Sequence, residues 1–297
     1  MHIKTCNIFP LKMGQTCEKM GTGRRKPANK NDAAHRKSCP EENIPGFPVS
    51  CEKELTMRLR NIPGARAIVK ASPFVVKNPY ERKGHWNDGS YKKIAVEVGM
   101  GKGRFIVEMA LEHPDTLFIG VERYESVLFR ACERMEGIPY RTPRDQIEQR
   151  AQAEEHPERD PALPIPENLL FLDRDARELP QIFDLDEVDT IYLNFSDPWP
   201  KARHAKRRLT SHQFLALYEQ FLRDGGSIEF KTDNTDLFEF SVEEITEAPR
   251  FELTAVTRDL HRDPVLSQGN IETEYERKFS ALGNKICKLT AVYHRVL

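Results

Sequence analysis

The chain has 297 residues, of which 39% are hydrophobic, and its 45 lysines and arginines nearly balance 46 aspartates and glutamates, for a net charge of −1. This length accommodates one large α/β domain or two smaller ones, and the composition argues against a disordered or fibrous chain. No apolar run is long enough to cross a bilayer, and the first residues lack the apolar core of a signal peptide, so we expect a cytoplasmic protein without a membrane span. The six cysteines form no Cys-x-x-Cys pair, and we expect no metal site.

Residues 1–56 differ from the rest of the chain. They show no periodic apolar pattern, and residues 1–60 carry 12 Lys and Arg against 6 Asp and Glu. We expect a disordered basic leader, followed by one folded domain over residues 57–297. Two explanations of the leader stay open, namely a dispensable disordered arm or a start codon assigned too far upstream.

From residue 93 onward, strand and helix patterns alternate. Apolar and β-branched runs predict seven strands, at 93–98, 116–121, 168–172, 188–195, 227–232, 251–256 and 288–294. Amphipathic spacing predicts helices at 103–112, 125–135, 211–222 and 235–247, the third capped by Thr210 or Ser211 and ended by Gly225. This alternation predicts an α/β fold with a mostly parallel seven-stranded sheet, helices on both faces and an antiparallel finish. A proline-rich stretch at 138–166, with a polar helical piece at 145–155, predicts an inserted surface loop.

The first strand runs directly into a glycine-rich loop. Gly99, Gly101 and Gly103 alternate with other residues, which lets the backbone turn tightly and approach a ligand at the start of the next helix. Such loops serve nicotinamide enzymes and S-adenosylmethionine-dependent methyltransferases alike. The Gly-x-Gly-x-Gly spacing favours a methyltransferase. So does Glu97, because its carboxylate would repel a pyrophosphate and attract the cationic amino acid end of S-adenosylmethionine. The alternative for Glu97 is a strand-end acid paired with a lysine.

Acids also follow the next two strands. Glu122 ends the second strand, where a carboxylate can accept hydrogen bonds from ribose hydroxyls. Asp175 follows the third strand and could accept from the exocyclic amine of adenine. It could equally cap a helix that begins near Glu178, and Asp173 competes for the same cofactor contact.

The fourth strand is followed by an unusual segment, residues 197–208, which reads Asp-Pro-Trp-Pro-Lys-Ala-Arg-His-Ala-Lys-Arg-Arg. An acid, a tryptophan between prolines and five cations within residues 201–208 are typical of a site that holds a flat base beside phosphates. Trp199 would either form a wall of a base pocket or pack beneath the loop. The alternative for the cations is a solvated basic loop.

From about Met57 to its end, the chain resembles the bacterial tRNA (guanine-N7-)-methyltransferases. The matching stretches are 57–61 (MRLRN), 97–103 (EVGMGKG), 120–122 (GVE), 194–201 (NFSDPWPK), 204–209 (HAKRRL), 231–234 (KTDN) and 273–276 (TEYE). The Asp-Pro-Trp-Pro-Lys segment with its basic continuation is the most specific of these, whereas the glycine loop is generic to a superfamily. The leader and the insertion at 138–166 depart from the family pattern.

The resemblance implies a class I, Rossmann-like methyltransferase that transfers a methyl group from S-adenosylmethionine to N7 of a guanine in the tRNA variable loop, position 46 in tRNA nomenclature. The cofactor contacts that we expect are Glu97, Gly99, Gly101, Gly103, Glu122, Asp175 and Asp197. The substrate contacts implied are Lys201, Asp233, Thr273, Glu274, Tyr275 and Glu276. We expect tRNA phosphates to bind Arg203, His204, Lys206, Arg207 and Arg208. The enzyme would be a monomer or a homodimer.

The chemistry of the implied reaction indicates what the acids do. Guanine N7 carries an in-plane lone pair and needs no deprotonation before it attacks a methyl sulfonium. We therefore expect alignment to matter more than a base, and Asp197 to stabilise the positive charge that moves onto the purine. Glu276 or Asp233 could accept hydrogen bonds from guanine N1–H and the 2-amino group, which would select guanine over adenine.

Three other classes of protein stay open. An amino-methyltransferase of DNA or protein glutamine carries an Asn/Asp-Pro-Pro-aromatic loop, but Trp199 stands here in place of the second proline. A nicotinamide oxidoreductase is disfavoured by the glycine spacing and by Glu97. A non-catalytic tRNA-binding subunit would not need the acids at the cofactor positions, and a measurement of cofactor binding would distinguish it.

Overall fold

The computed structural model describes residues 62–136 and 164–295. The chain divides into two units, Met1–Leu55 and Thr56–Leu297, and every described residue belongs to the second. The predicted leader, the helical piece at 145–155 and most of the proline-rich insertion lie outside the described residues. No helix within the described ranges has both the length and the apolar character needed to cross a membrane.

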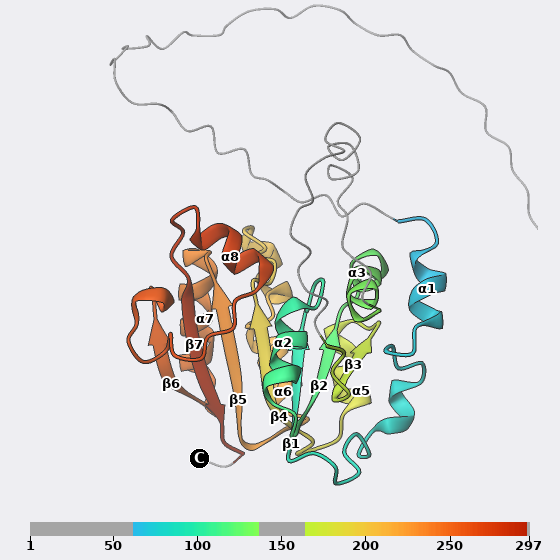
Figure 1. The fold of residues 1–297 in the computed structure, drawn as a ribbon. Coiled ribbons are helices and arrows are strands. Elements are labelled where there is room, and N and C mark those ends of the chain that lie inside the picture. Colours follow the sequence, from blue (N-terminus) through green and yellow to red (C-terminus); the bar gives the residue numbers. More distant parts are fainter. Residues whose placement is uncertain (1–61, 137–163, 296–297) are drawn as a thin grey trace, which may run out of the picture. The chain divides into compact units, whose positions relative to one another are not determined.

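The described residues form one sheet of seven strands, in the order β3-β2-β1-β4-β5-β7-β6 (Figure 1). The first five strands along the chain pair in parallel, and β7 runs antiparallel to both of its neighbours, β5 and β6. The strands are β1 (Lys93–Val98), β2 (Thr116–Val121), β3 (Leu169–Leu172), β4 (Val188–Asn194), β5 (Leu222–Thr232), β6 (Phe251–Thr257) and β7 (Cys287–Tyr293). The predicted α/β fold, with a mostly parallel seven-stranded sheet and an antiparallel finish, is confirmed.

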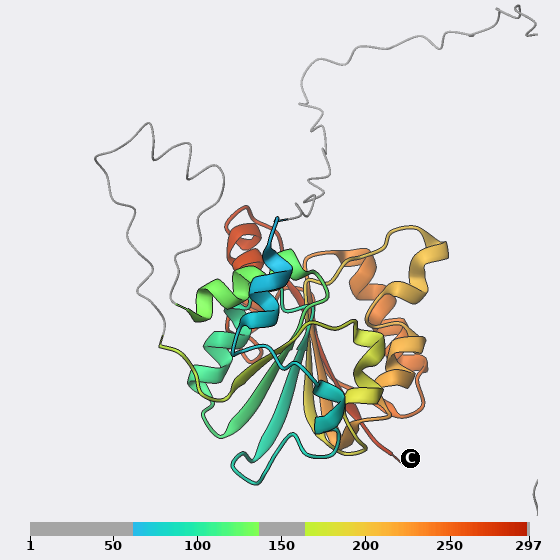
Figure 2. The same ribbon diagram turned by 90° about the vertical axis from the view of Figure 1, so that its right-hand side faces the viewer.

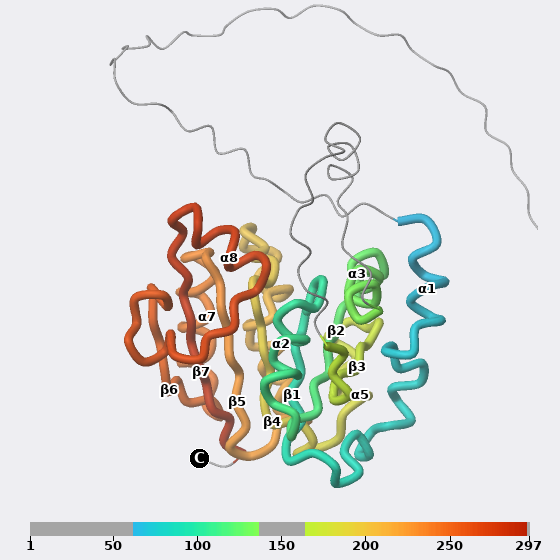
Figure 3. The backbone as a smooth tube through the Cα atoms, viewed as in Figure 1, coloured from blue at the N-terminus to red at the C-terminus, as the bar shows by residue number. Residues whose placement is uncertain are grey.

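Helices cover both faces of the sheet (Figure 2). One face carries α1 (Ala65–Ala71), α2 (Arg104–Glu112) and α3 (Glu125–Met135), and the other carries α5 (Leu179–Ile182), α6 (His212–Tyr218) and α7 (Thr235–Glu247). Short 3-10 helices in the described residues complete these connections: η1 (Pro79–Arg82), η2 (Ala176–Glu178), η3 (Ala202–Arg207) and η4 (Leu260–Arg262). The last helix, α8 (Glu274–Ser280), leads into β7. In Figure 3 the backbone can be traced from α8 into β7, which lies between β5 and β6.

The covered faces explain why all of β2, and all of β1 except its first residue, are buried. Successive side chains of a strand point to opposite faces, so a strand with helices on both sides buries every residue. In β1, Ile94 and Val96 enter the core beneath α5–α7, whereas Ala95 enters the core beneath α2 and α3. All six residues of β2 are buried, and Phe118 lies in the same core as Ala95.

The predicted bounds of β1, β2, α3 and α7 are those observed, but the helix predicted at 211–222 is wrong in its last four residues. Helix α6 ends at Tyr218, and β5 begins at Leu222, which pairs with Val188 of β4. Gly225, with φ 75°, lies inside β5 and does not end a helix. Two buried residues, Phe221 and Leu222, fit an apolar helix face and a strand equally well, so the pattern alone did not locate the boundary.

Candidate active site

The acids predicted from the sequence meet at one edge of the sheet. Glu97 lies at the end of β1, and Glu122, Asp175, Asp197 and Asp233 follow β2, β3, β4 and β5. These five strands run parallel, so their carboxyl ends share an edge. The strand order reverses between β1 and β4, and in open α/β sheets ligands bind in the crevice at such a point.

The glycine loop after β1 requires its glycines. Gly99, Gly101 and Gly103 have φ values of 77°, 59° and 77°, in the left-handed region that other residues rarely adopt. A Cβ atom on Gly103 would lie 3.2 Å from Cβ of Ala131 in α3, so this glycine also lets α2 begin close to α3. The N–H of Gly101 donates to Oε2 of Glu122 at 3.2 Å, which ties the loop to the end of β2.

Glu97 is a buried carboxyl group with one oxygen unused. The residue is 2% exposed, and Oε1 accepts a hydrogen bond of 2.9 Å from Nδ2 of Asn194. Oε2 is buried without a hydrogen-bond partner among the described residues. Burial raises the pKa of Glu97 to about 8, against the opposing effects of the Asn194 hydrogen bond and the charge of Lys231. A buried acceptor without a partner is costly, so this oxygen fits a cationic donor on a ligand.

Glu122 faces the same loop from the end of β2. It is 7% exposed, and Oε1 accepts from the N–H of Tyr124 at 2.9 Å, while Oε2 accepts from Gly101. Burial raises the pKa of Glu122. A carboxylate has about four acceptor positions, so two remain for donors such as ribose hydroxyls.

Asp175 has the capping role that the sequence left open. Its side chain accepts from the N–H of Arg177 at 3.0 Å, and Glu178 completes a capping box at the start of η2. Ion pairs join it to Arg177 at 2.8 Å and to Arg123 at 3.5 Å, and the hydrogen bond from Arg177 lowers the pKa of Asp175 to about 2. Burial raises the pKa of its competitor Asp173. A contact between Asp175 and a cofactor stays a prediction.

The loop after β4 presents Asp197 to solvent on a strained backbone. Asp197 is exposed and makes no hydrogen bond or ion pair with the described residues. Phe195 and Trp199, two residues to either side, have φ values of 50° and 44°. Non-glycine residues in this region cost about 1–3 kcal/mol each and are held there by their surroundings. Arg208 supplies such a hold, because Nε donates to the carbonyl of Pro198 at 2.9 Å and Nη2 to that of Trp199 at 3.2 Å.

The basic segment that follows forms η3 and not a loop. None of the residues of η3 is buried. Arg203, Lys206 and Arg207 are exposed, as is Lys201 just before η3. The guanidinium carbon of Arg207 lies 4.8 Å from the ring centroid of Trp199. The ring of His204 meets the Trp199 ring edge-on, with 5.7 Å between the centroids. The partly buried Trp199 thus packs against the basic segment.

The structure brings Lys231 and Glu276 together in a buried network. Nζ of Lys231 donates to Oε2 of Glu276 at 2.8 Å, to the carbonyl of Ile271 at 2.9 Å and to Oδ1 of Asn270 at 3.1 Å. Oε1 of Glu276 faces Nδ2 of Asn270 at 2.8 Å and Nε2 of His261 at 3.1 Å. Glu276 is fully buried, so a guanine edge could reach it only if this network opened.

Asp233 is therefore the more accessible of the two acids considered for guanine recognition. It is half-buried, and Oδ2 accepts from Nδ2 of Asn284 at 3.1 Å and from the hydroxyl of Tyr275 at 3.4 Å. The Tyr275 ring lies against the ring of Phe195, with 4.9 Å between the centroids, and stacks on the ring of Phe279, with 4.1 Å between the centroids. Burial, followed by the charge of Asp233, raises the pKa of Tyr275 to about 12.

The start of α8 is tied to the glycine loop. The side chain of Thr273 caps the helix by accepting from the N–H of Glu276 at 2.9 Å. Glu274 forms ion pairs with Lys102 of the glycine loop, at 3.5 Å, and with Arg134 of α3. The residues that the resemblance assigns to the substrate thus adjoin the loop assigned to the cofactor.

One group of side chains near α8 has the composition of a metal site. Ligand atoms of His261, Glu272 and Glu276 all lie within 4.8 Å of one another. The ammonium of Lys231, 2.8 Å from Glu276, would oppose a metal cation there. The predicted absence of a metal stays a prediction.

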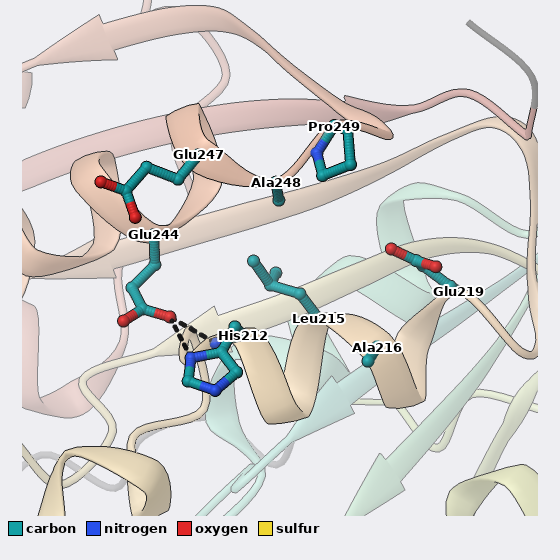
Figure 4. Close-up of a pocket in the computed structure, with 8 residues that line it drawn as sticks. All are labelled: His212, Leu215, Ala216, Glu219, Glu244, Glu247, Ala248 and Pro249. Carbon is teal, nitrogen blue, oxygen red and sulfur yellow. Dashed lines mark hydrogen bonds and ion pairs between the residues drawn. The ribbon is translucent and has the colours of Figure 1, made fainter.

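Two site residues, Asn194 and Lys231, were missed by sequence reasoning, and Arg208 was predicted as a phosphate contact but not as a partner of the Asp197 loop. Asn194 and Lys231 are polar residues near the ends of buried strands, and that position was a signal that could have singled them out. Arg208 carried no such signal, because nothing in the sequence separates it from the neighbouring cations. A pocket between α6 and α7, drawn in Figure 4, contains none of the predicted site residues and is bordered by the His212–Glu244 pair.

The sheet order, the glycine loop after β1 and the acids at the ends of β1 and β2 define a class I, Rossmann-like methyltransferase. Residues 91–289 match the protein family described as "Putative methyltransferase". The tRNA (guanine-N(7)-)-methyltransferase of Lachnoclostridium phytofermentans is 46% identical over 79% of this chain and 98% of its own length, and that of Brevibacillus brevis is 44% identical over the same shares. The chain belongs to the tRNA (guanine-N(7)-)-methyltransferase family.

A solved structure with a similar course of the backbone is titled "Structure of an Antibiotic Related Methyltransferase". It is 18% identical, covers 69% of this chain and 89% of its own, and has a TM-score of 0.46. No functional conclusion follows from a likeness of this size.

Proposed function

We propose that this chain transfers a methyl group from S-adenosylmethionine to N7 of a guanine in the variable loop of tRNA, at position 46. The observation that carries the proposal is the buried Oε2 of Glu97 beside the glycine loop, which has no hydrogen-bond partner within residues 62–136 and 164–295. It lies at the end of β1, next to the strand that leads into Asp197 and the basic segment. The names of the relatives support methyl transfer to guanine N7 of tRNA.

The residues around the loop fit S-adenosylmethionine. When bound, the cofactor supplies a methyl group on a positively charged sulfur. Glu97 would accept from its amino group, and Glu122 from its ribose hydroxyls through the two remaining acceptor positions. The backbone at Gly99, Gly101 and Gly103 would let the ligand approach closely. Asp175 would accept from the adenine amine while it continues to cap η2.

Asp197 would act on the base without taking a proton from it. Guanine N7 attacks with its own lone pair, so a bond forms from N7 to the methyl carbon as the bond from that carbon to sulfur breaks. Positive charge then passes to the purine, and the exposed carboxylate of Asp197 would stabilise it. Asp233 would accept from the N1–H and 2-amino edge of guanine, and Lys201, just before η3, would contact the substrate.

The exposed cations of η3 would hold the tRNA backbone. Arg203, His204, Lys206 and Arg207 follow Asp197 within one short segment, so phosphates bound there would lie close to the reacting base. Such contacts position a nucleic acid and do not read its sequence. A cytoplasmic location and a monomeric or homodimeric state stay predictions.

The test is to incubate the full chain with unmodified tRNA and S-adenosylmethionine labelled in the methyl group, then to digest the tRNA and separate the nucleosides. The proposal predicts label in 7-methylguanosine. Label in another nucleoside, or none in the tRNA, would overturn it.

A further inference from the structure

The backbone of the Asp197 loop needs an external hold. Trp199 precedes Pro200, and a residue before proline is restricted to extended conformations by the proline ring. Its observed φ of 44° lies far from that region, and Phe195 at 50° adds a second strained residue on the other side of Asp197. Without compensating contacts, the loop would relax to an ordinary backbone conformation.

Arg208 makes the contacts that suit this purpose. Two nitrogens of its planar guanidinium donate to two successive carbonyls, those of Pro198 and Trp199, at 2.9 and 3.2 Å. The same guanidinium lies over the ring of Phe240 in α7, 4.2 Å from the ring centroid, and this cation–π contact attaches it to the helix. A lysine could keep the charge at this position but could not reproduce a planar pair of donors.

We propose that Arg208 is a positioning residue, which holds the Asp197 loop in its strained conformation and thereby aims Asp197 at the reacting base. This role rests on the function proposed for Asp197. It separates Arg208 from Arg203, which is exposed and makes no hydrogen bond to the loop backbone among the described residues. Arg208 thus acts on the loop, whereas its exposed neighbours would act on phosphates.

The two tryptophans allow the loop to be observed without any enzymatic reaction. The chain contains only Trp86 and Trp199. Trp86 is 4% exposed, and its indole N–H donates to the carbonyl of Ile182 at 2.9 Å, so it reports the folded core. Full-length protein labelled with 5-fluorotryptophan gives two fluorine NMR signals, which a Trp199→Phe variant assigns.

The comparison uses matched substitutions at two arginines of one segment. In Arg208→Lys and Arg208→Gln we expect the Trp199 signal to shift and broaden or split, while the Trp86 signal keeps its position. In Arg203→Lys and Arg203→Gln we expect both signals to keep their positions and widths. Phe240→Leu, which removes the ring beneath the guanidinium without touching the loop, should change the Trp199 signal in the same direction as Arg208→Lys. A Trp199 signal that is unchanged in both Arg208 variants overturns the proposal.

Kinetics and salt dependence separate positioning from phosphate binding. At saturating tRNA and cofactor, Arg208→Lys should lower kcat by about 10²-fold, as misplacement of a reacting group by about 1 Å can do. The slope of log affinity for tRNA against log salt should stay the same in Arg208→Gln, whereas a lost phosphate contact would lower it by about 0.7–0.9. An unchanged kcat in Arg208→Lys, or a shallower slope in Arg208→Gln, contradicts the positioning role. If the wild-type chain does not methylate tRNA, the proposed function fails, yet the NMR comparison still decides whether Arg208 holds the loop.

Discussion

The side chains of Asn194 and Glu97 form a buried hydrogen bond of 2.9 Å between the ends of β4 and β1. It joins the two strands between which the sheet order reverses, and it directs one carboxyl oxygen to Asn194 while the other has no partner in the described part of the chain. The free oxygen is the feature on which cofactor binding would depend. Its burial also has consequences for stability and for proton exchange.

Glu97 should make the ligand-free protein less stable as pH rises. Burial raises its pKa from 4.5 to about 8, so between these values the folded chain keeps a proton that the unfolded chain releases. The free energy of unfolding should fall with rising pH in this window, by at most about 1.4 kcal/mol per pH unit from this group. Glu97→Gln should remove that contribution, so its stability relative to wild type should rise from pH 5 to pH 8. Urea unfolding of both proteins at the two pH values measures this, and parallel pH dependences would contradict it.

Cofactor binding should release a proton at neutral pH. With a pKa raised to about 8 by burial, the carboxyl group of Glu97 should be mostly protonated in the free protein at pH 7, and a cationic amino group favours its ionised form. Calorimetry with S-adenosylhomocysteine, in buffers of different ionisation enthalpy, should therefore detect proton release. Glu97→Gln should bind about 10- to 100-fold more weakly, the value of a hydrogen bond to a charged group, and should lack this release. Equal proton release by the two proteins would exclude a contact between Glu97 and the amino group of the cofactor.

Asp197→Asn should impair catalysis and leave the fold unchanged. The side chain is exposed and has no partner among the described residues, so its loss should not shift the midpoint of thermal unfolding. Loss of one preorganised electrostatic group commonly lowers kcat by about 10²–10³-fold. Single-turnover rates at saturating cofactor and tRNA measure this loss.

The same assay on wild type tests whether a base is needed. Because N7 has no proton to lose, the saturated single-turnover rate should vary little with pH above neutrality. A rate that rises tenfold per pH unit through neutrality would show that a deprotonation limits the reaction, and Asp197 would need another role.

The exposed cations of η3 should contribute to tRNA affinity through charge. The double variant Arg203→Gln, Lys206→Gln should bind tRNA more weakly, and the slope of log affinity against log salt should become shallower by about 0.7–0.9 per lost contact. A matched control is Arg223→Gln, Lys92→Gln, because these exposed cations lie near the amino ends of β5 and β1, at the opposite edge of the sheet. Equal slopes in the two double variants would show that the η3 cations face solvent and do not bind tRNA phosphates.

The fold was predictable wherever burial alone decides local structure. Strands β1 and β2 are buried on both faces, so their apolar runs have clear ends, and the predicted bounds match the observed ones. The region from 211 to 232 was less predictable, because Phe221 and Leu222 satisfy either periodicity and only pairing with β4 decides between them. Helix α8 was missed because its seven residues bury only Glu276, and its start is held by polar contacts.

For the site, the sequence identified the acids but not their partners. Parallel strands bring their carboxyl ends to one edge, so the positions of Glu97, Glu122 and Asp197 followed from the strand order. Which side chains face one another across that edge depends on packing between distant segments. The bonds from Asn194 to Glu97 and from Lys231 to Glu276 join residues 97 and 45 positions apart, and no local pattern encodes them.

The central claim is that N7 of the variable-loop guanine accepts the methyl group, and a single atom tests it. The measurement uses a tRNA in which that guanine is replaced by 7-deazaguanine, where a C–H group takes the place of N7, and compares it with a tRNA that carries the same replacement at another guanine. With labelled S-adenosylmethionine, the variable-loop replacement should abolish methyl transfer while tRNA affinity is kept, and the control replacement should leave transfer intact. Methyl transfer at the wild-type rate to the tRNA with the variable-loop replacement would contradict the account.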